Sequence, residues 1–106
     1  MSSRFLKVMG NTPKMRLLEF LITGRELDYS LSDISKNANI PWSTLHRILP
    51  PFEKSKIIVK TREVGRAKLY RVNPDNEEAR ALIEIFDSIL KKELEANQEK
   101  IKVATK

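Results

Sequence analysis

Two short stretches of the chain carry the side chains best suited to chemistry. Residues 42–47 combine aromatic, hydroxyl and basic groups, and residues 60–71 place several cations on either side of one glycine. The side chains concerned are Trp42, Ser43, Thr44, His46 and Arg47 in the first stretch, and Lys60, Arg62, Arg66, Lys68 and Arg71 in the second. Guanidinium, ammonium and hydroxyl groups bind phosphates, so both stretches suit a polyanionic partner.

The same residues give little support to catalysis or to a metal site. His46 is the only histidine and cysteine is absent, which excludes disulfides, thiolate nucleophiles and cysteine-based zinc sites. A catalytic histidine needs a partner group that the sequence does not supply. The sequence contains no glycine-rich phosphate loop, EF-hand loop or Glu-x-x-His pair. We therefore expect a protein that is not an enzyme and that has no cofactor and no bound metal.

The overall charge also favours a polyanionic partner. The 106 residues include 20 Lys and Arg against 14 Asp and Glu, which gives a net charge of +6 and an isoelectric point near 9.7. Counterion release favours polyanions, although charge alone does not separate DNA from RNA or an anionic lipid surface. The length suits one domain. Without a signal sequence or about 20 consecutive apolar residues, the chain is expected to be cytoplasmic.

Helix-start signals place two helices in the first part of the chain. Thr12 can cap the free amides of a helix over residues 13–23, which begins with a proline. Ser30 starts a second helix over residues 31–37, and an acid three positions further on resembles the partner in a capping box. The apolar patch at residues 5–9 is too short to assign to a helix or a strand. We expect it to pack under the helix at 13–23.

A third helix follows a tight turn and begins at Pro41 or Ser43. Pro50 has no N–H for the carbonyl four residues earlier, and its ring crowds that turn. We therefore expect this helix to bend or end near Leu49, with Phe52 still packed inward.

Residues that favour β-structure then indicate a hairpin of two strands, residues 57–61 and 69–72, around Gly65. Strict alternation along the first strand would place a basic face over an apolar one. The basic face would carry Ile58, Lys60 and Arg62, and the apolar face would carry Ile57, Val59 and Thr61. With a final helix after the hairpin, the fold class is mainly α with a small β-hairpin (α+β).

The most informative segment is residues 31–49, LSDISKNANIPWSTLHRIL. Its apolar spacing suits two helices packed at a steep angle across a short turn, with buried positions at Ile34, Ala38, Ile40, Leu45 and Ile48. The segment resembles the helix-turn-helix of winged helix-turn-helix transcription regulators, particularly the ArsR-like and MarR-like regulators of archaea. Residues 57–72, IIVKTREVGRAKLYRV, resemble their wing, and the resemblance covers residues 12–74. Ser35 and Asn39 depart from the usual Ala and Gly, but Ser is small and Asn readily adopts the left-handed conformation.

This resemblance implies a DNA-binding regulator of transcription. The third helix would lie in the major groove and present Trp42, Ser43, Thr44, His46 and Arg47. The wing would place Lys60, Arg62, Arg66 and Lys68 on the DNA backbone or in the minor groove. Arg47 is best suited to bond guanine through two hydrogen bonds.

Each of these contacts has a plainer alternative. Trp42 can cover the packing between the two helices, and Arg47 can form a surface ion pair. The hairpin cations can serve only to discourage strand pairing at a sheet edge. The fold can also serve as a protein-interaction module of a transcription or chromatin complex, whereas RNA binding lacks the stacking aromatics it commonly uses.

Residues 76–98 are predicted to form the final helix, capped by Asp75 or Asn76. Its apolar stripe comprises Ala79, Leu82, Ile83, Phe86, Ile89, Leu90, Leu94 and, further on, Ile101. A helix of about 25 residues spans roughly 37 Å, which is more than a small domain covers. We therefore expect its distal half to pair with a second copy of the chain. The expected dimerisation residues are Leu82, Ile83, Phe86, Ile89, Leu90 and Leu94.

Pairing would give a homodimer with two recognition helices about 34 Å apart, which predicts an inverted repeat in double-stranded DNA. The chain would then divide into a winged helix-turn-helix domain, residues 1–74, and a dimerisation helix with a tail, residues 75–106. The alternative is that the final helix folds back over the helix at residues 13–23.

Overall fold

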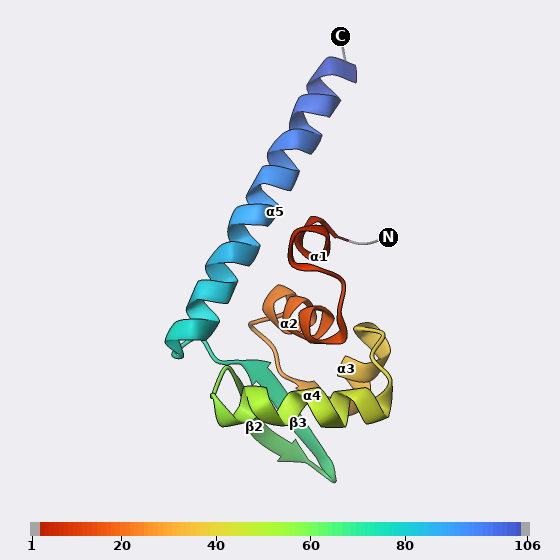
Figure 1. The fold of residues 1–106 in the computed structure, drawn as a ribbon, viewed down its shortest axis with the longest axis vertical. Helices are drawn as coiled ribbons and strands as arrows, with labels where there is room; N and C mark the ends of the chain where they lie inside the picture. Colours follow the sequence, from red (N-terminus) through yellow and green to blue (C-terminus); the bar gives the residue numbers. More distant parts are fainter. Residues whose placement is uncertain (1–2, 105–106) are drawn as a thin grey trace.

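The computed structural model of the chain describes residues 3–104, and the side chains of residues 3–98. Helices dominate, and a small three-stranded antiparallel sheet and a long C-terminal helix complete the fold, which confirms the expected fold class (Figure 1). The elements in chain order are α1 (Arg4–Met9), α2 (Pro13–Thr23), β1 (Tyr29–Ser30), α3 (Leu31–Asn37), α4 (Trp42–Lys54), β2 (Ile58–Val64), β3 (Ala67–Val72) and α5 (Glu77–Ala104). The short elements α1 and β1 are additions to the predicted order.

Side-chain caps begin helices α2, α3 and α5 at the predicted places. The hydroxyl of Thr12 accepts a hydrogen bond from the amide of Met15 at 3.2 Å, and that of Ser30 accepts one from Asp33 at 3.1 Å. Asn76 rather than Asp75 caps α5, because its Oδ1 accepts the Ala79 amide at 2.9 Å. These caps satisfy amides that have no partner within the helix.

The turn between α3 and α4 depends on the two residues that depart from the resembled pattern. Asn39 lies in the left-handed region with φ 54°, which asparagine tolerates better than most residues. The Ser35 hydroxyl donates to the Ile40 carbonyl at 2.6 Å, and the Ile40 amide donates to the Ser35 carbonyl at 3.0 Å. Ser35 therefore closes the turn with a bond that alanine cannot form.

All five predicted core positions of this segment are buried. They join a single core that also takes residues from α1, α2, the sheet and α5. The helix-turn-helix is therefore fixed on the body of the domain, and its other face is left to solvent.

Helix α4 continues through both prolines, so it does not end near Leu49, and the alternative of a bend there stays a prediction. Helix α4 reaches Lys54 with Pro50 and Pro51 inside it. Both prolines are exposed, so the carbonyls that lose an amide partner face water rather than the core. Buried Leu49 on one side and Phe52, packed on the core as predicted, on the other hold the helix in place.

The sheet has the order β1-β3-β2 with all neighbours antiparallel. Gly65, at φ 63°, supplies the left-handed residue in the tight turn between Val64 and Ala67. The register shifts between Lys60 and Arg62, so an irregularity at Thr61 interrupts the strand pairing. The predicted division into a basic and an apolar face is therefore wrong, because alternation breaks at this irregularity and Ile58 is buried.

Helix α5 packs on its own chain over its first half and extends past it over the rest (Figure 1). Ala79 and Phe86 are buried, and the Phe86 ring meets that of Phe5 in α1 edge to face at 5.4 Å. The patch at residues 5–9 thus forms a helix that contacts α5 as well as α2. Among the described helices none is both long enough and apolar enough to cross a bilayer.

Candidate nucleic-acid interface

Helix α4 presents its predicted contact residues on one solvent-facing side. Ser43, His46 and Arg47 are exposed and Thr44 is half-buried, while Leu45 and Ile48 are buried on the opposite side. Residues three and four apart share a helix face, so the buried pair fixes which way the others point. The helix therefore offers hydroxyl, imidazole and guanidinium groups to a partner outside the domain.

The first turn of α4 has no side-chain cap. Its N-cap residue is Pro41, whose side chain makes no capping hydrogen bond. The first amides of a helix carry a partial positive charge and bind anions when left without partners. This end of α4 is thus suited to lie near a phosphate.

Trp42 stands at the start of α4 and is 50% exposed. Its ring meets that of His46, one turn further on, at a centroid distance of 4.7 Å and an interplanar angle of 73°. The contact is within one helix, so about half of the indole remains exposed to solvent.

The five cations of the hairpin differ in the groups that they contact. Arg66 and Lys68 at the tip are exposed and form no ion pair among the described residues. Lys60 forms an ion pair with Glu63 at 3.1 Å. Arg71 is turned inward, where its Nη2 donates to the Arg25 carbonyl at 2.9 Å. The tip therefore carries the hairpin cations that are most available to a polyanion.

Arg62, a predicted DNA contact, forms an ion pair with a carboxylate from outside the hairpin. Its Nε and Nη2 donate to the two oxygens of Asp28 at 3.0 and 3.1 Å, and the Thr61 hydroxyl donates to the same carboxylate at 2.6 Å. The hydrogen bond from Arg62, followed by that from Thr61, lowers the pKa of Asp28 from 3.8 to about 2. The same bond raises the pKa of Arg62. Asp28 thus ties the irregular part of β2 to the connection between α2 and β1.

We expect the pKa of the Asp28 carboxyl to be about 2 in the wild type and to rise towards its ordinary 3.8 in an Arg62→Gln variant, which keeps the hydrogen bond from Thr61. Because the folded pKa lies below the unfolded one, the pair stabilises the fold above about pH 4 and this contribution is lost as the pH falls towards 2. NMR titration of the carboxyl carbon measures both values. Equal pKa values in the two proteins would show that the pair does not form in solution.

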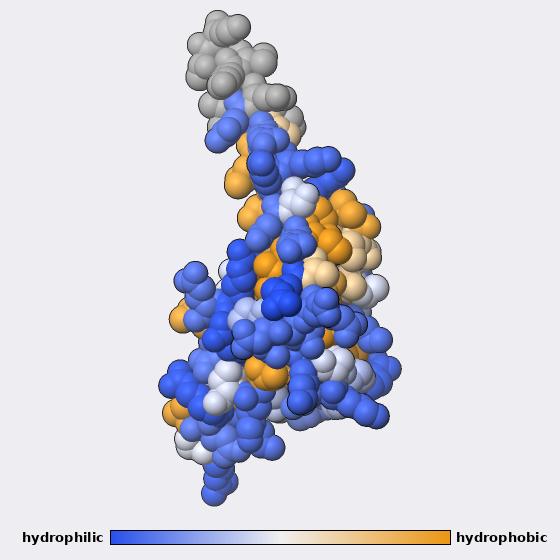
Figure 2. Space-filling model, turned by 90° about the vertical axis from the view of Figure 1, so that its left-hand side faces the viewer, coloured by the Kyte–Doolittle hydropathy of each residue, from blue (hydrophilic) through white to orange (hydrophobic). Residues whose placement is uncertain are grey.

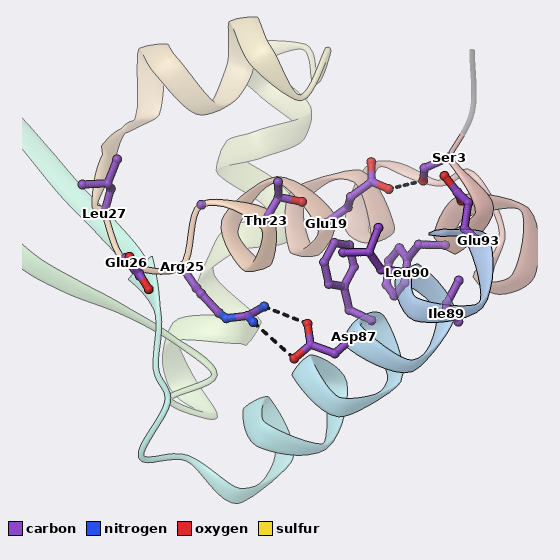
Figure 3. A pocket seen from close by; sticks show the side chains of 13 residues that line it. Ser3, Glu19, Thr23, Arg25, Glu26, Leu27, Asp87, Ile89, Leu90 and Glu93 are labelled. Atoms are coloured by element: carbon purple, nitrogen blue, oxygen red, sulfur yellow. Dashed lines mark hydrogen bonds and ion pairs between the residues drawn. The ribbon is translucent and has the colours of Figure 1, made fainter. Parts of the chain in front are cut away.

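A cavity of about 790 Å³ lies at the other end of the domain, between α1, the end of α2 and α5 (Figure 3). Across it, Arg25 donates to both oxygens of Asp87 in α5, at 3.1 and 3.2 Å. At its far side the Ser3 hydroxyl donates to Glu19. Arg25 and Asp28 belong to the same connection, so this segment joins α5 to the wing.

The predicted dimerisation residues divide between the domain core and the solvent. Leu82, Ile83 and Ile89 are half-buried against the core of their own chain, and Phe86 is buried there. Leu90 and Leu94 remain 39% and 52% exposed and line a shallow groove on α5. The Ile101 side chain lies outside those described. The alternative in which α5 packs on α2 therefore describes its first half only.

The two ends of the molecule differ in character. The hairpin and α4 lie towards one end, and the C-terminal part of α5 projects towards the other (Figure 1). On the α5 side, hydrophobic residues gather at mid-height around α5, whereas the lower end is largely hydrophilic (Figure 2). The groups suited to a polyanion and the exposed leucines of α5 thus occupy different surfaces.

A helix-turn-helix followed by a β-hairpin, with a third short strand beside it, defines the winged-helix fold, and solved structures share it. The transcriptional regulator HlyU from Vibrio vulnificus CMCP6 gives 21% sequence identity and a TM-score of 0.58 over 81% of this chain and 83% of that one. The homodimeric winged helix-turn-helix DNA-binding domain of Mb0332 from Mycobacterium bovis, described as a possible ArsR-family regulator, gives 18% identity and a TM-score of 0.57 over 88% and 81%.

A third similar structure is the F27L mutant of MepR from S. aureus bound to an oligodeoxyribonucleotide, with 16% identity and a TM-score of 0.59 over 97% of this chain and 85% of that one. No protein-family model matches the chain, and no curated protein matches it in sequence. At these identities the likeness establishes the winged-helix fold. Membership of the ArsR-like or MarR-like regulators, and an archaeal type, stay predictions.

Proposed function

We propose that this chain is a sequence-specific double-stranded DNA-binding protein that regulates transcription. Helix α4 enters the major groove, and the wing contacts the backbone or the minor groove. The observation that carries the proposal is the exposure of Arg47 on α4 and of Arg66 and Lys68 at the wing tip, without ion-pair partners among the described residues. The similarity of the fold to a regulator bound to an oligodeoxyribonucleotide supports it.

The contacts sort into two kinds. Arg47, with Ser43 and His46 beside it, lies on the helix that can reach base edges, where guanine offers two acceptors to one guanidinium. Arg66 and Lys68 lie on a narrow hairpin whose tip suits phosphates or a narrow minor groove. Arg62 contributes less than the sequence suggests, because Asp28 already neutralises it.

The same proposal includes a homodimer formed through the distal half of α5. Leu90 and Leu94 are large apolar side chains that their own chain leaves exposed, and a second α5 is the simplest cover with two-fold symmetry. The similar Mb0332 domain is described as homodimeric. Two α4 helices would then meet successive major grooves about 34 Å apart, on an inverted repeat.

Selection of bound duplexes from a random pool tests the proposal. We expect a palindromic consensus with half-site centres about one helical turn apart, bound with an affinity that falls steeply with salt. Single-stranded DNA of the same sequence should compete poorly. Failure to bind any duplex at low salt would contradict the proposal and favour a protein-interaction module instead.

A further inference from the structure

Trp42 is a large aromatic side chain that the fold buries only in part. It occupies the first position of α4 and is 50% exposed, whereas Leu45 and Ile48 complete the packing of the same helix. Exposed apolar surface is unfavourable in water. The exposed leucines through which the proposed dimer would form lie on a different element, α5.

The orientation of the indole is set by its neighbour on the helix. The His46 ring lies edge to face against it at 4.7 Å, which is a favoured geometry for two aromatic rings. The contact spans one helical turn and limits the positions that the indole can adopt. The indole and the imidazole therefore lie together on the solvent-exposed surface of α4.

The chemistry of indole narrows what this surface can recognise. Tryptophan has one N–H donor and no acceptor, and it carries no charge for a phosphate. What it offers is apolar surface. In the major groove the apolar group on a base edge is the 5-methyl of thymine, which favours contact with apolar side chains.

We propose that Trp42, oriented by His46, is a specificity-determining residue that contacts the 5-methyl group of thymine in the major groove. The inference rests on the proposed function, because it requires α4 to lie in that groove. Two residues of α4 would then recognise different bases: Arg47 bonds guanine and Trp42 selects thymine. His46 acts through Trp42 and is a positioning residue.

Replacement of thymine by deoxyuridine tests the inference, because it removes only the methyl group. Each thymine of the selected duplex is replaced in turn, and binding is measured by fluorescence anisotropy at fixed salt. We expect one thymine in each half-site whose replacement weakens wild-type binding about fourfold, since a buried methylene-sized group is worth about 0.8 kcal/mol. The Trp42→Ala variant should bind the two duplexes equally.

Three further variants separate a base contact from a structural role. Trp42→Phe keeps an apolar ring and should retain part of the preference for thymine over deoxyuridine. His46→Ala should reduce this preference while Trp42 is still present. Arg47→Ala serves as the matched control on the same helix, and should keep the thymine preference although its overall affinity falls. Circular dichroism and thermal melting verify that each variant is folded.

The outcomes distinguish the inference from the proposed function. If the wild type binds no duplex, the proposed function fails and this inference fails with it. If the wild type binds a defined duplex but every thymine can be replaced without loss, the inference is overturned and the proposed function stands. The inference is also overturned if Trp42→Ala weakens binding to both duplexes by the same factor and so keeps the preference for thymine.

Discussion

An Arg47→Ala variant is expected to bind its selected duplex about 5- to 150-fold more weakly for each half-site that it contacts, while its binding to random duplexes changes far less. The size follows from the loss of a paired hydrogen bond to guanine, which is worth about 1–3 kcal/mol of base discrimination. Arg47 is exposed on α4 and forms no ion pair among the described residues, so its removal leaves the fold intact. Parallel titrations of both duplexes measure the change in specificity.

Two matched variants separate base recognition from charge. Arg47→Lys keeps the charge but loses the planar pair of donors, so binding to random duplexes should recover while binding to the selected one should not. Lys68→Ala removes a charge at each of the two wing tips of the dimer, and should weaken both duplexes alike and reduce the slope of log affinity against log salt by about two units, about one for each protomer. Equal losses on selected and random DNA for Arg47→Ala would refute its assignment to a base.

The elements that could be predicted from the sequence are those that local signals determine. Thr12, Ser30 and Asn76 each stand where a side-chain oxygen accepts an amide of the first turn. Such caps act within three residues, so the helices they begin can be recognised without knowledge of the rest of the fold. The exposed face of α4 was predictable for the same reason, because the spacing of Leu45 and Ile48 fixes the buried side.

The features that the sequence did not reveal depend on contacts between distant residues. The six residues of α1 are stabilised by tertiary packing, above all by Phe5 against Phe86. The two residues of β1 form a strand only because they pair with β3. At Pro50 a local rule allowed α4 to end, but the helix continues, since Leu49 and Phe52 pack on the core on either side of the prolines.

The pairing of Arg62 with Asp28, within the candidate site, also depends on a contact between residues distant in the sequence. Spacing alone placed Arg62 among the available cations of the wing. Its partner lies before β1, which reaches the hairpin only through the sheet order β1-β3-β2, and the irregularity at Thr61 turns both side chains towards it. No signal in the neighbouring residues indicates this contact. The hairpin therefore holds fewer available cations than its composition suggests.

The largest effect is expected from the double variant Leu90→Glu and Leu94→Glu, which should be monomeric and should lose tight binding to the selected duplex. In a two-fold symmetric dimer both leucines of each protomer are buried at the interface, which makes four leucines in all. Four half-exposed leucines at about 1 kcal/mol each amount to about 4 kcal/mol, or about a thousandfold in the dimer dissociation constant. Sedimentation equilibrium measures the assembly state and duplex titration measures the binding.

Because these leucines are 39% and 52% exposed, the double variant should keep its helical circular dichroism, which separates loss of pairing from loss of folding. Ser88→Glu is the matched control, since Ser88 is exposed and lies about 160° around α5 from Leu90 at 3.6 residues per turn. It adds one glutamate to the same helix away from the groove, and should stay dimeric. A double variant that still forms dimers, or a wild type that is a monomer when bound to its selected duplex, would show that the distal half of α5 is not the pairing surface.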